Sequence, residues 1–188
     1  MSHSRTKVYL LLSGGTDSAA LIPFYLRQQA YIQAVHFNYG QLSFVGEDRA
    51  ASKISEYYEI PLIKLNLGFQ LNSTKGEYHS RNAILLFSTA SMIEGGKGRV
   101  AIGIHAGTPY YDCSAGFLSD MQRIFDGYFN GLIQIEAPFL NFFKQDIYHY
   151  CKLVNVPMKI TFSCEKQSDY PCGKCPSCLD RSILNEPS

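Results

Sequence analysis

Apolar positions divide the chain into short continuous runs and longer stretches with helical spacing. The runs at 8–12, 31–38, 61–65, 99–104 and 132–136 predict strands, and the first two are expected to be buried inside a parallel sheet. Stretches with helical spacing alternate with these runs. One follows the first run and ends near residue 29, and the others lie at 43–59, 83–93, 117–129 and 145–154. Because parallel strands need crossover connections, this alternation predicts an α/β fold with a five-stranded parallel sheet and helices on both faces.

The ends of these strands indicate where a ligand would bind. In open parallel sheets ligands bind outside the carboxyl ends of the strands, at the point where the strand order reverses. The segment 66–80 has no clear period and predicts a loop over that site. We expect the loops at the carboxyl ends of the strands to converge at that site. They follow Leu12, Asn38, Leu65, Ile104 and Glu136.

One helix carries a proline. Pro23 lies far enough into the first helix to bend it.

Composition excludes several classes of protein. The 188 residues are 46% hydrophobic, which suits one globular domain without disulfide support. The net charge is +1 and no basic run stands out, which argues against a nucleic-acid partner. No apolar run approaches the roughly 18 residues of a membrane span, and the first residues are polar. We expect a cytosolic protein that does not enter a membrane.

The first strand and helix are joined by Ser13-Gly14-Gly15-Thr16-Asp17-Ser18. Glycines allow positive φ, so that successive N–H groups can face an anion in front of the positive helix end. Ser13, Thr16 and Ser18 add hydroxyl donors, and Asp17 can hold Mg²⁺ or orient the loop. The segment lacks the lysine of a Walker A loop and is not G-x-G-x-x-G. It predicts a phosphate-binding loop, with a plain helix cap as the alternative.

Four of the six cysteines lie close together, at Cys164, Cys172, Cys175 and Cys178. Four thiolates at this spacing fit a tetrahedral zinc site, which we call the zinc knot, and the alternatives are a redox pair or an iron–sulfur cluster. Cys151 lies on the apolar face of the last predicted helix and is expected in the core. Cys113 lies in the loop at 105–113, where it is either packed or reactive.

The loop resembles the PP-loop, S-G-G-x-D-S, of the N-type ATP pyrophosphatases. Together with the zinc knot, the chain resembles the 7-cyano-7-deazaguanine synthase family, often written QueC, over nearly its whole length. The resemblance rests on further motifs: Phe37-Asn38-Tyr39-Gly40-Gln41 for F-D-Y-G-Q, Ser80-Arg81-Asn82 for G-R-N, Tyr110-Tyr111-Asp112-Cys113-Ser114 for Y-P-D-C-R, Lys144 for a lysine after the last strand, and Arg181 after the cysteines.

This resemblance implies an adenine nucleotide alpha hydrolase-like fold. Residues 1–160 would form the PP-loop domain, and 161–188 a zinc-binding segment of the same domain. It also implies an AMP-forming carbon–nitrogen ligase that adenylates 7-carboxy-7-deazaguanine with ATP and Mg²⁺. Ammonia then gives the amide, and a second ATP gives the nitrile.

The resemblance also implies roles for single residues. Asp17, Lys144 and Arg81 would be catalytic, although each of the two cations has a solvated surface charge as its alternative. ATP would contact Ser13, Gly14, Gly15, Thr16, Asp17, Ser18, Phe37 and Tyr39. The deazaguanine would contact Arg81, Asn82, Tyr110 and Asp112, with ordinary packing as the alternative for the tyrosines. Structural zinc would bind Cys164, Cys172, Cys175 and Cys178.

The chain departs from the family pattern on the side that would accept the amine. The segment Ile104–Thr108 is short and lacks an acid, His105 stands near that position, and the sequence ends at Ser188. A second hypothesis is therefore a relative that joins the activated carboxylate to a larger amine, such as one on a protein, as in bacterial defence loci.

Two further classes are less well supported. A tRNA sulfur transferase would need a basic face and a metal-free cysteine pair. A nucleotide-binding module without turnover would need the loss of a loop or cation position. A homodimer is compatible with the sequence, which does not determine the oligomeric state.

Overall fold

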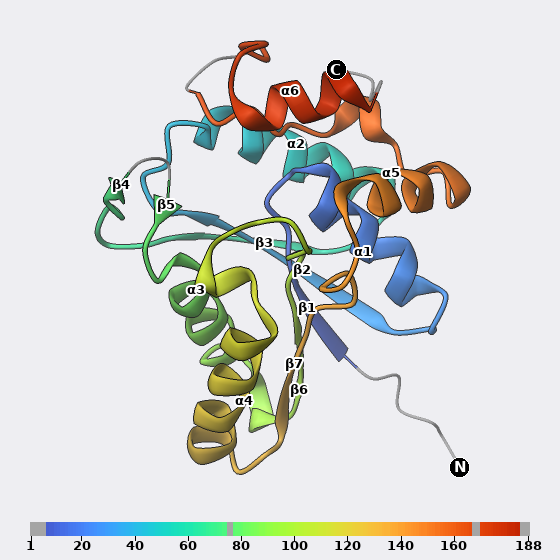
Figure 1. Cartoon of the computed structure of the whole chain (residues 1–188). Coiled ribbons are helices and arrows are strands. Elements are labelled where there is room, and N and C mark those ends of the chain that lie inside the picture. The colour runs from blue at the N-terminus through green and yellow to red at the C-terminus, as the bar shows by residue number, and fades with distance from the viewer. Residues whose placement is uncertain (1–6, 75–76, 167–169, 185–188) are drawn as a thin grey trace.

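The computed structural model describes residues 7–74, 77–166 and 170–184, and its centre is a parallel sheet (Figure 1). The sheet has five strands in the order β3-β2-β1-β6-β7, and every neighbouring pair is parallel. Val8 of the central strand lies opposite Ile32 on one side and Arg99 on the other. The strands are β1 (Lys7–Leu11), β2 (Tyr31–Asn38), β3 (Leu62–Asn66), β6 (Gly98–Ala101) and β7 (Ile133–Glu136).

Helices cover both faces of this sheet, as the sequence predicts (Figure 1). One face carries α1 (Thr16–Leu26), α2 (Phe44–Tyr57) and α5 (Lys144–Leu153), and the other carries α3 (Arg81–Ala90) and α4 (Ala115–Phe129). Successive side chains of a strand point to opposite faces. Accordingly Leu10 belongs to the first core, and Tyr9 and Leu11 belong to the second. Both faces of β1 are therefore buried.

The strand order reverses between β1 and β6, because the chain leaves β1 toward β2 and returns on the other side to form β6. Such a reversal opens a crevice at the carboxyl ends of the two strands. Gly103, just beyond β6, closes this point tightly, since a Cβ there would lie 3.2 Å from backbone atoms of Asp17 and Ser18. The start of α1 is thereby held beside the end of β6.

Some predicted boundaries were wrong. The segment 66–80 is not all loop, since β4 (Ser73–Thr74) and β5 (Glu77–Tyr78) form an antiparallel pair of strands, too short for alternation to reveal it. The stretch 145–154 is not the last helix, because α6 (Pro176–Ile183) begins inside the cysteine motif. Short 3-10 turns occupy Glu94–Gly96 (η1), Tyr111–Cys113 (η2) and Met158–Ile160 (η3).

Two further expectations concern helices. Pro23 lies inside α1, which continues to Leu26. Among the described residues, no helix has both the length and the apolar character that crossing a membrane requires.

Candidate active site

The segment Ser13–Ser18, which we call the PP-loop, lies between β1 and α1 at the strand-order reversal. Gly14 has a φ of +90°, and a Cβ there would lie 2.6 Å from the main-chain oxygen of Glu47 in α2. Only glycine fits both conditions without strain. Gly15 is different, because its φ of −80° is open to any residue. The positive φ that glycine allows is therefore used at Gly14 and not at Gly15.

Hydroxyl groups brace the PP-loop from within. The Gly15 N–H donates to Ser13 Oγ over 3.3 Å, and the hydroxyls of Ser13 and Ser18 are 3.0 Å apart. Thr16 differs, since it is 1% exposed and its Oγ1 lies 3.3 Å from Thr161 Oγ1. Its hydroxyl therefore faces the segment behind the loop, and its role in binding ATP stays a prediction.

Asp17 and Lys144 form an ion pair beside the PP-loop, although they are 127 positions apart. Lys144 Nζ donates to both carboxylate oxygens of Asp17, at 2.8 and 2.6 Å. His105 Nε2 is 3.6 Å from the same carboxylate, and its Nδ1 is 2.6 Å from the carbonyl oxygen of Ala106. The Lys144 side chain is only 25% exposed. The structure thus favours a positioned cation over a solvated surface charge.

Gln41 and Glu47 connect the PP-loop to the turn after β2. The Gln41 side chain accepts from the Tyr39 N–H at 2.9 Å and donates to the Phe37 carbonyl and to Glu47 Oε2, each at 2.9 Å. The Glu47 main chain contacts Gly14, as described above. Neither residue was among the predicted site residues. Nothing in the amphipathic pattern of 43–59 marks Glu47, because its role depends on α2 crossing the loop.

Arg81, at the start of α3, lies between Tyr39 and Asp112. Burial opposes its charge, but Tyr39 and Asp112 outweigh that effect and raise the pKa of its guanidinium above the ordinary value. Burial also raises the pKa of Tyr39 to about 12, so its phenol stays neutral near pH 7. The Asn82 side-chain amide donates to the Asp112 carbonyl at 3.0 Å, and the Asn82 N–H donates to the Asp112 carboxylate at 3.4 Å. Arg81 Nε donates to Asn82 Oδ1 at 3.1 Å, so the half-buried Arg81 and the buried Asn82 and Asp112 form one polar unit.

Phe37, Tyr110 and Cys113 complete the predicted set. Phe37 is 4% exposed and packs in the core against the α3–α4 face of the sheet, so its place in ATP binding stays a prediction. Tyr110 is half-buried and precedes η2. Burial, with Asp112 beside it, raises the pKa of Cys113 to about 12. That thiol is protonated near neutral pH, which favours the packed alternative over the reactive one.

A cavity of about 360 Å³ opens beside Asp112, between the start of α3 and α4. Its wall includes apolar side chains of Phe117 and Met121 as well as the carboxylates of Glu77 and Asp120. Tyr111 stands at this cavity and is 60% exposed. A flat apolar group with hydrogen-bond donors on one edge would match this lining.

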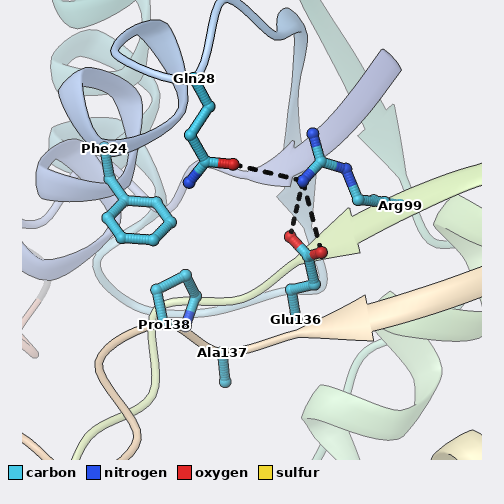
Figure 2. Close-up of a pocket in the computed structure, with 6 residues that line it drawn as sticks. All are labelled: Phe24, Gln28, Arg99, Glu136, Ala137 and Pro138. Carbon is cyan, nitrogen blue, oxygen red and sulfur yellow. Dashed lines mark hydrogen bonds and ion pairs between the residues drawn. The ribbon is translucent and has the colours of Figure 1, made fainter. Parts of the chain in front are cut away.

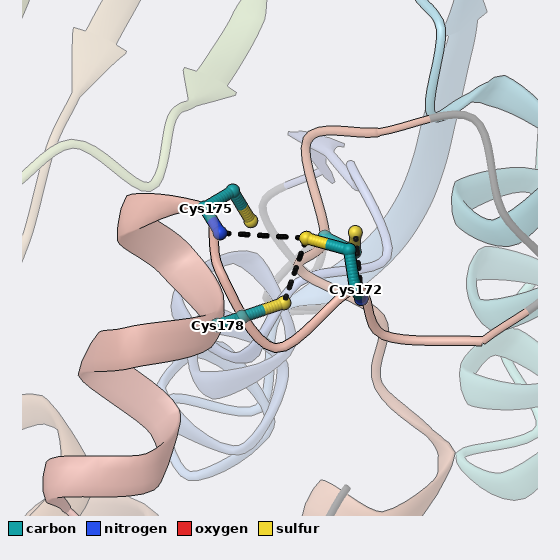
Figure 3. Close-up of side chains that lie close together, drawn as sticks. Cys172, Cys175 and Cys178 are labelled. Carbon is teal, nitrogen blue, oxygen red and sulfur yellow. Dashed lines mark hydrogen bonds between the residues drawn. The ribbon is translucent and has the colours of Figure 1, made fainter.

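The four predicted zinc ligands come together near the start of α6, and Figure 3 labels three of them, Cys172, Cys175 and Cys178. Their sulfur atoms all lie within 4.8 Å of one another, and those of Cys172 and Cys178 are 4.0 Å apart. Thiolates around tetrahedral zinc are separated by about 3.8 Å, given bonds of about 2.3 Å. Backbone N–H groups of Lys174 and Cys175 lower the pKa of Cys172 to about 6, whereas burial raises the pKa of Cys164 and raises that of Cys178 to about 12. The cluster therefore fits a metal ion.

A second cavity, of about 300 Å³, lies near the C-terminal end of α1, away from the PP-loop. Figure 2 shows the residues that line it. Glu136 accepts a hydrogen bond from the Tyr25 hydroxyl at 2.6 Å and forms an ion pair with Arg99 at 3.4 Å. Arg99 also reaches Gln28 at 3.5 Å. These contacts connect α1 to β6 and β7, which is a structural role.

Comparison with known proteins gives a consistent result. The family model for "Queuosine biosynthesis protein QueC" matches residues 7–78 and 72–183. The 7-cyano-7-deazaguanine synthase of Aquifex aeolicus is 28% identical over 204 residues, covering 93% of this chain and 94% of the relative. That of Nautilia profundicola is 30% identical over 203 residues, covering 92% and 90%.

Solved structures share the fold at low identity. NMN synthetase from Francisella tularensis has a TM-score of 0.52 and 14% identity, covering 99% of this chain and 79% of its own. The NH3-dependent NAD synthetase from Campylobacter jejuni has a TM-score of 0.52 and 18% identity, covering 82% and 66%.

Proposed function

Because the chain belongs to the QueC family, we propose that it is an ATP-dependent ligase that activates the carboxylate of 7-carboxy-7-deazaguanine. Its curated relatives are named 7-cyano-7-deazaguanine synthase. The observation that carries the proposal is the Asp17–Lys144 ion pair beside a PP-loop whose Gly14 has no room for a side chain. A fixed carboxylate and a fixed cation at a phosphate-binding loop are what adenylate formation requires.

In the first step a carboxylate oxygen of the substrate attacks the α-phosphorus of ATP, and pyrophosphate leaves with the electrons of the broken P–O bond. The PP-loop amides and Lys144 hold the departing phosphates, and Asp17 positions that lysine before ATP arrives. Mg²⁺ bound at Asp17 would neutralise charge on the phosphate oxygens. Lys144 exchanges its contact with Asp17 for the phosphates as ATP arrives. Because ATP is cleaved between its α and β phosphates, ADP is not a product.

The deazaguanine ring lies in the 360 Å³ cavity beside Asp112. The carboxylate of Asp112 accepts hydrogen bonds from the N–H edge of the ring, and Arg81 orients Asp112 while keeping its own charge. Ammonia then attacks the acyl carbon of the adenylate, loses a proton, and displaces AMP to give the amide. The amide oxygen then attacks the α-phosphorus of a second ATP and releases a second pyrophosphate, and loss of AMP and the two nitrogen protons gives the nitrile.

The metal site is proposed to hold zinc on Cys164, Cys172, Cys175 and Cys178. Four sulfur ligands leave no open position for water, so its role is structural. A homodimer, the cytosolic location and the boundary between residues 160 and 161 stay predictions.

The test combines the enzyme with ATP, Mg²⁺, 7-carboxy-7-deazaguanine and saturating ammonium. Nucleotides are separated by chromatography, and the deazaguanine is followed by mass spectrometry. We expect AMP and pyrophosphate, with the substrate converted first to the amide and then to the nitrile. ADP with free phosphate as the main products would refute the proposal.

A second function is coupling of the activated carboxylate to a larger amine, such as one on a protein. The observation that favours it is the exposed rim of the cavity at Tyr111, with Glu77 and Asp120 nearby to attract a cation. An acyl-adenylate must also be shielded from water, and a bound partner would provide cover that the short segment 104–108 does not. With ammonium this alternative gives AMP but little nitrile. Nitrile forming at about 1 per second or faster would exclude it.

A further inference from the structure

Arg181 connects the zinc knot to the segment behind the PP-loop. It lies in α6 and is only 5% exposed. One guanidinium nitrogen donates to the carbonyl oxygen of Thr161 at 3.3 Å and to its hydroxyl oxygen at 3.1 Å. A second guanidinium nitrogen donates to the carbonyl oxygen of Met158 at 3.2 Å. A buried guanidinium with this set of acceptors fixes the backbone at 158–161 relative to α6.

Thr161 passes this constraint to the PP-loop. Its hydroxyl donates to the Met158 carbonyl at 2.7 Å, so its oxygen accepts from Arg181. The same oxygen lies 3.3 Å from Thr16 Oγ1. Since the Thr161 proton is already used, the geometry makes Thr16 the donor in that pair. The direction of the Thr16 side chain at the start of α1 is thus set from behind the loop.

Phe162 makes a second contact with the loop. Its N–H donates to the Gly14 carbonyl oxygen at 2.9 Å. Its ring fills the space beside Gly46, where an added Cβ would overlap the ring. Gly14 and Thr16 are therefore both held by adjacent residues of one segment, and that segment is held by Arg181.

We propose that Arg181, Thr161 and Phe162 form a strut through which the zinc knot positions the PP-loop for ATP. The inference rests on the proposed function, in which this loop binds the phosphates. A loop with two glycines has much conformational freedom, and fixing its amides before ATP arrives increases affinity. Arg181 and Thr161 are positioning residues, since they act on ATP through Gly14 and Thr16.

The test compares three variants of the zinc-loaded protein by calorimetric titration with Mg²⁺ and ATP, without the deazaguanine. Thr161→Val keeps the shape of the side chain but removes the hydroxyl, and Thr161→Ser keeps the hydroxyl. Thr89→Val is the matched control, because Thr89 is also buried and its hydroxyl donates to the Leu85 carbonyl at 2.8 Å within α3. Zinc content and melting temperature are measured for each.

Thr161→Val is expected to weaken ATP binding about tenfold, the scale of one lost buried hydrogen bond, while keeping one zinc per chain. Thr161→Ser should bind ATP within about twofold of the original protein. Thr89→Val should lower the melting temperature by about as much as Thr161→Val does, and it should leave ATP affinity unchanged. This pattern separates positioning from general destabilisation.

Arg181→Lys gives an independent measurement. It keeps the charge but cannot reach Met158 and Thr161 in the same geometry, so ATP affinity should fall as in Thr161→Val. The strut is refuted if Thr161→Val and Arg181→Lys bind ATP like the original protein. It is also refuted if ATP affinity falls only in proportion to lost zinc, or if it falls by the same factor in Thr89→Val. Failure of the original protein to bind ATP would instead refute the proposed function.

Discussion

Replacing Gly14 by alanine tests how closely the PP-loop depends on α2. At a φ of +90° an alanine is strained by about 1–2 kcal/mol. Its Cβ would also lie 2.6 Å from the Glu47 carbonyl oxygen and 3.1 Å from the Ala50 Cβ. Carbon–oxygen contacts of this kind ordinarily start near 3.3 Å, so α2 must shift, at about 1–3 kcal/mol. The smaller entropy of the unfolded alanine chain offsets about 0.4–1 kcal/mol.

The net expectation for Gly14→Ala is a loss of about 2–4 kcal/mol in the free energy of unfolding. For a domain of this size that lowers the melting temperature by about 4–16 °C. The assay is thermal unfolding followed by circular dichroism on the zinc-loaded protein, with ATP affinity measured in parallel. Affinity should fall more than tenfold, because the loop amides move with Gly14.

Gly127→Ala is the matched control for the same chemical change. Gly127 lies in α4, and nothing stands within 4 Å of the Cβ that alanine would add. Alanine there should stabilise the helix by about 0.5–1 kcal/mol and raise the melting temperature slightly. A Gly14→Ala protein that melts within about 2 °C of the original and binds ATP normally would show that the reasoning about the Glu47 contact is wrong.

Three other expectations follow from the site. Asp17→Ala and Lys144→Ala should each slow AMP formation by at least about a hundredfold, measured by pyrophosphate release, because each removes one half of a preorganised ion pair; a loss below about threefold would contradict the assignment. Cys172→Ser should lower both metal content, by mass spectrometry of the native protein, and melting temperature, since metal binding is coupled to folding; iron in the original protein would contradict the zinc assignment. Cys113, whose pKa is raised to about 12, should resist iodoacetamide at pH 8 in peptide mapping, because its thiol stays protonated until the pH approaches that value, and rapid alkylation of the folded protein would be inconsistent with its burial.

Local pattern was enough to predict much of the fold. Each parallel strand carries its own apolar run, although the edge strands β3 and β7 are only partly buried, so five strands and their crossover helices could be located without knowledge of contacts. The PP-loop and the four cysteines are equally local, because their function depends on spacing within a few residues. The antiparallel pair β4–β5 and helix α6 were missed, since neither two-residue strands nor an eight-residue helix within a cysteine motif gives a clear period.

Only the tertiary structure decided which segments far apart in the chain come into contact. Asp17 and Lys144 are paired because α1 and α5 start beside each other on one face of the sheet. Glu47 contacts Gly14 because α2 crosses the loop, and Thr161 reaches Thr16 from 145 positions away. Such contacts depend on how elements pack rather than on the residues within any one of them. The sequence therefore determined which chemical groups were present, and packing determined which of them meet.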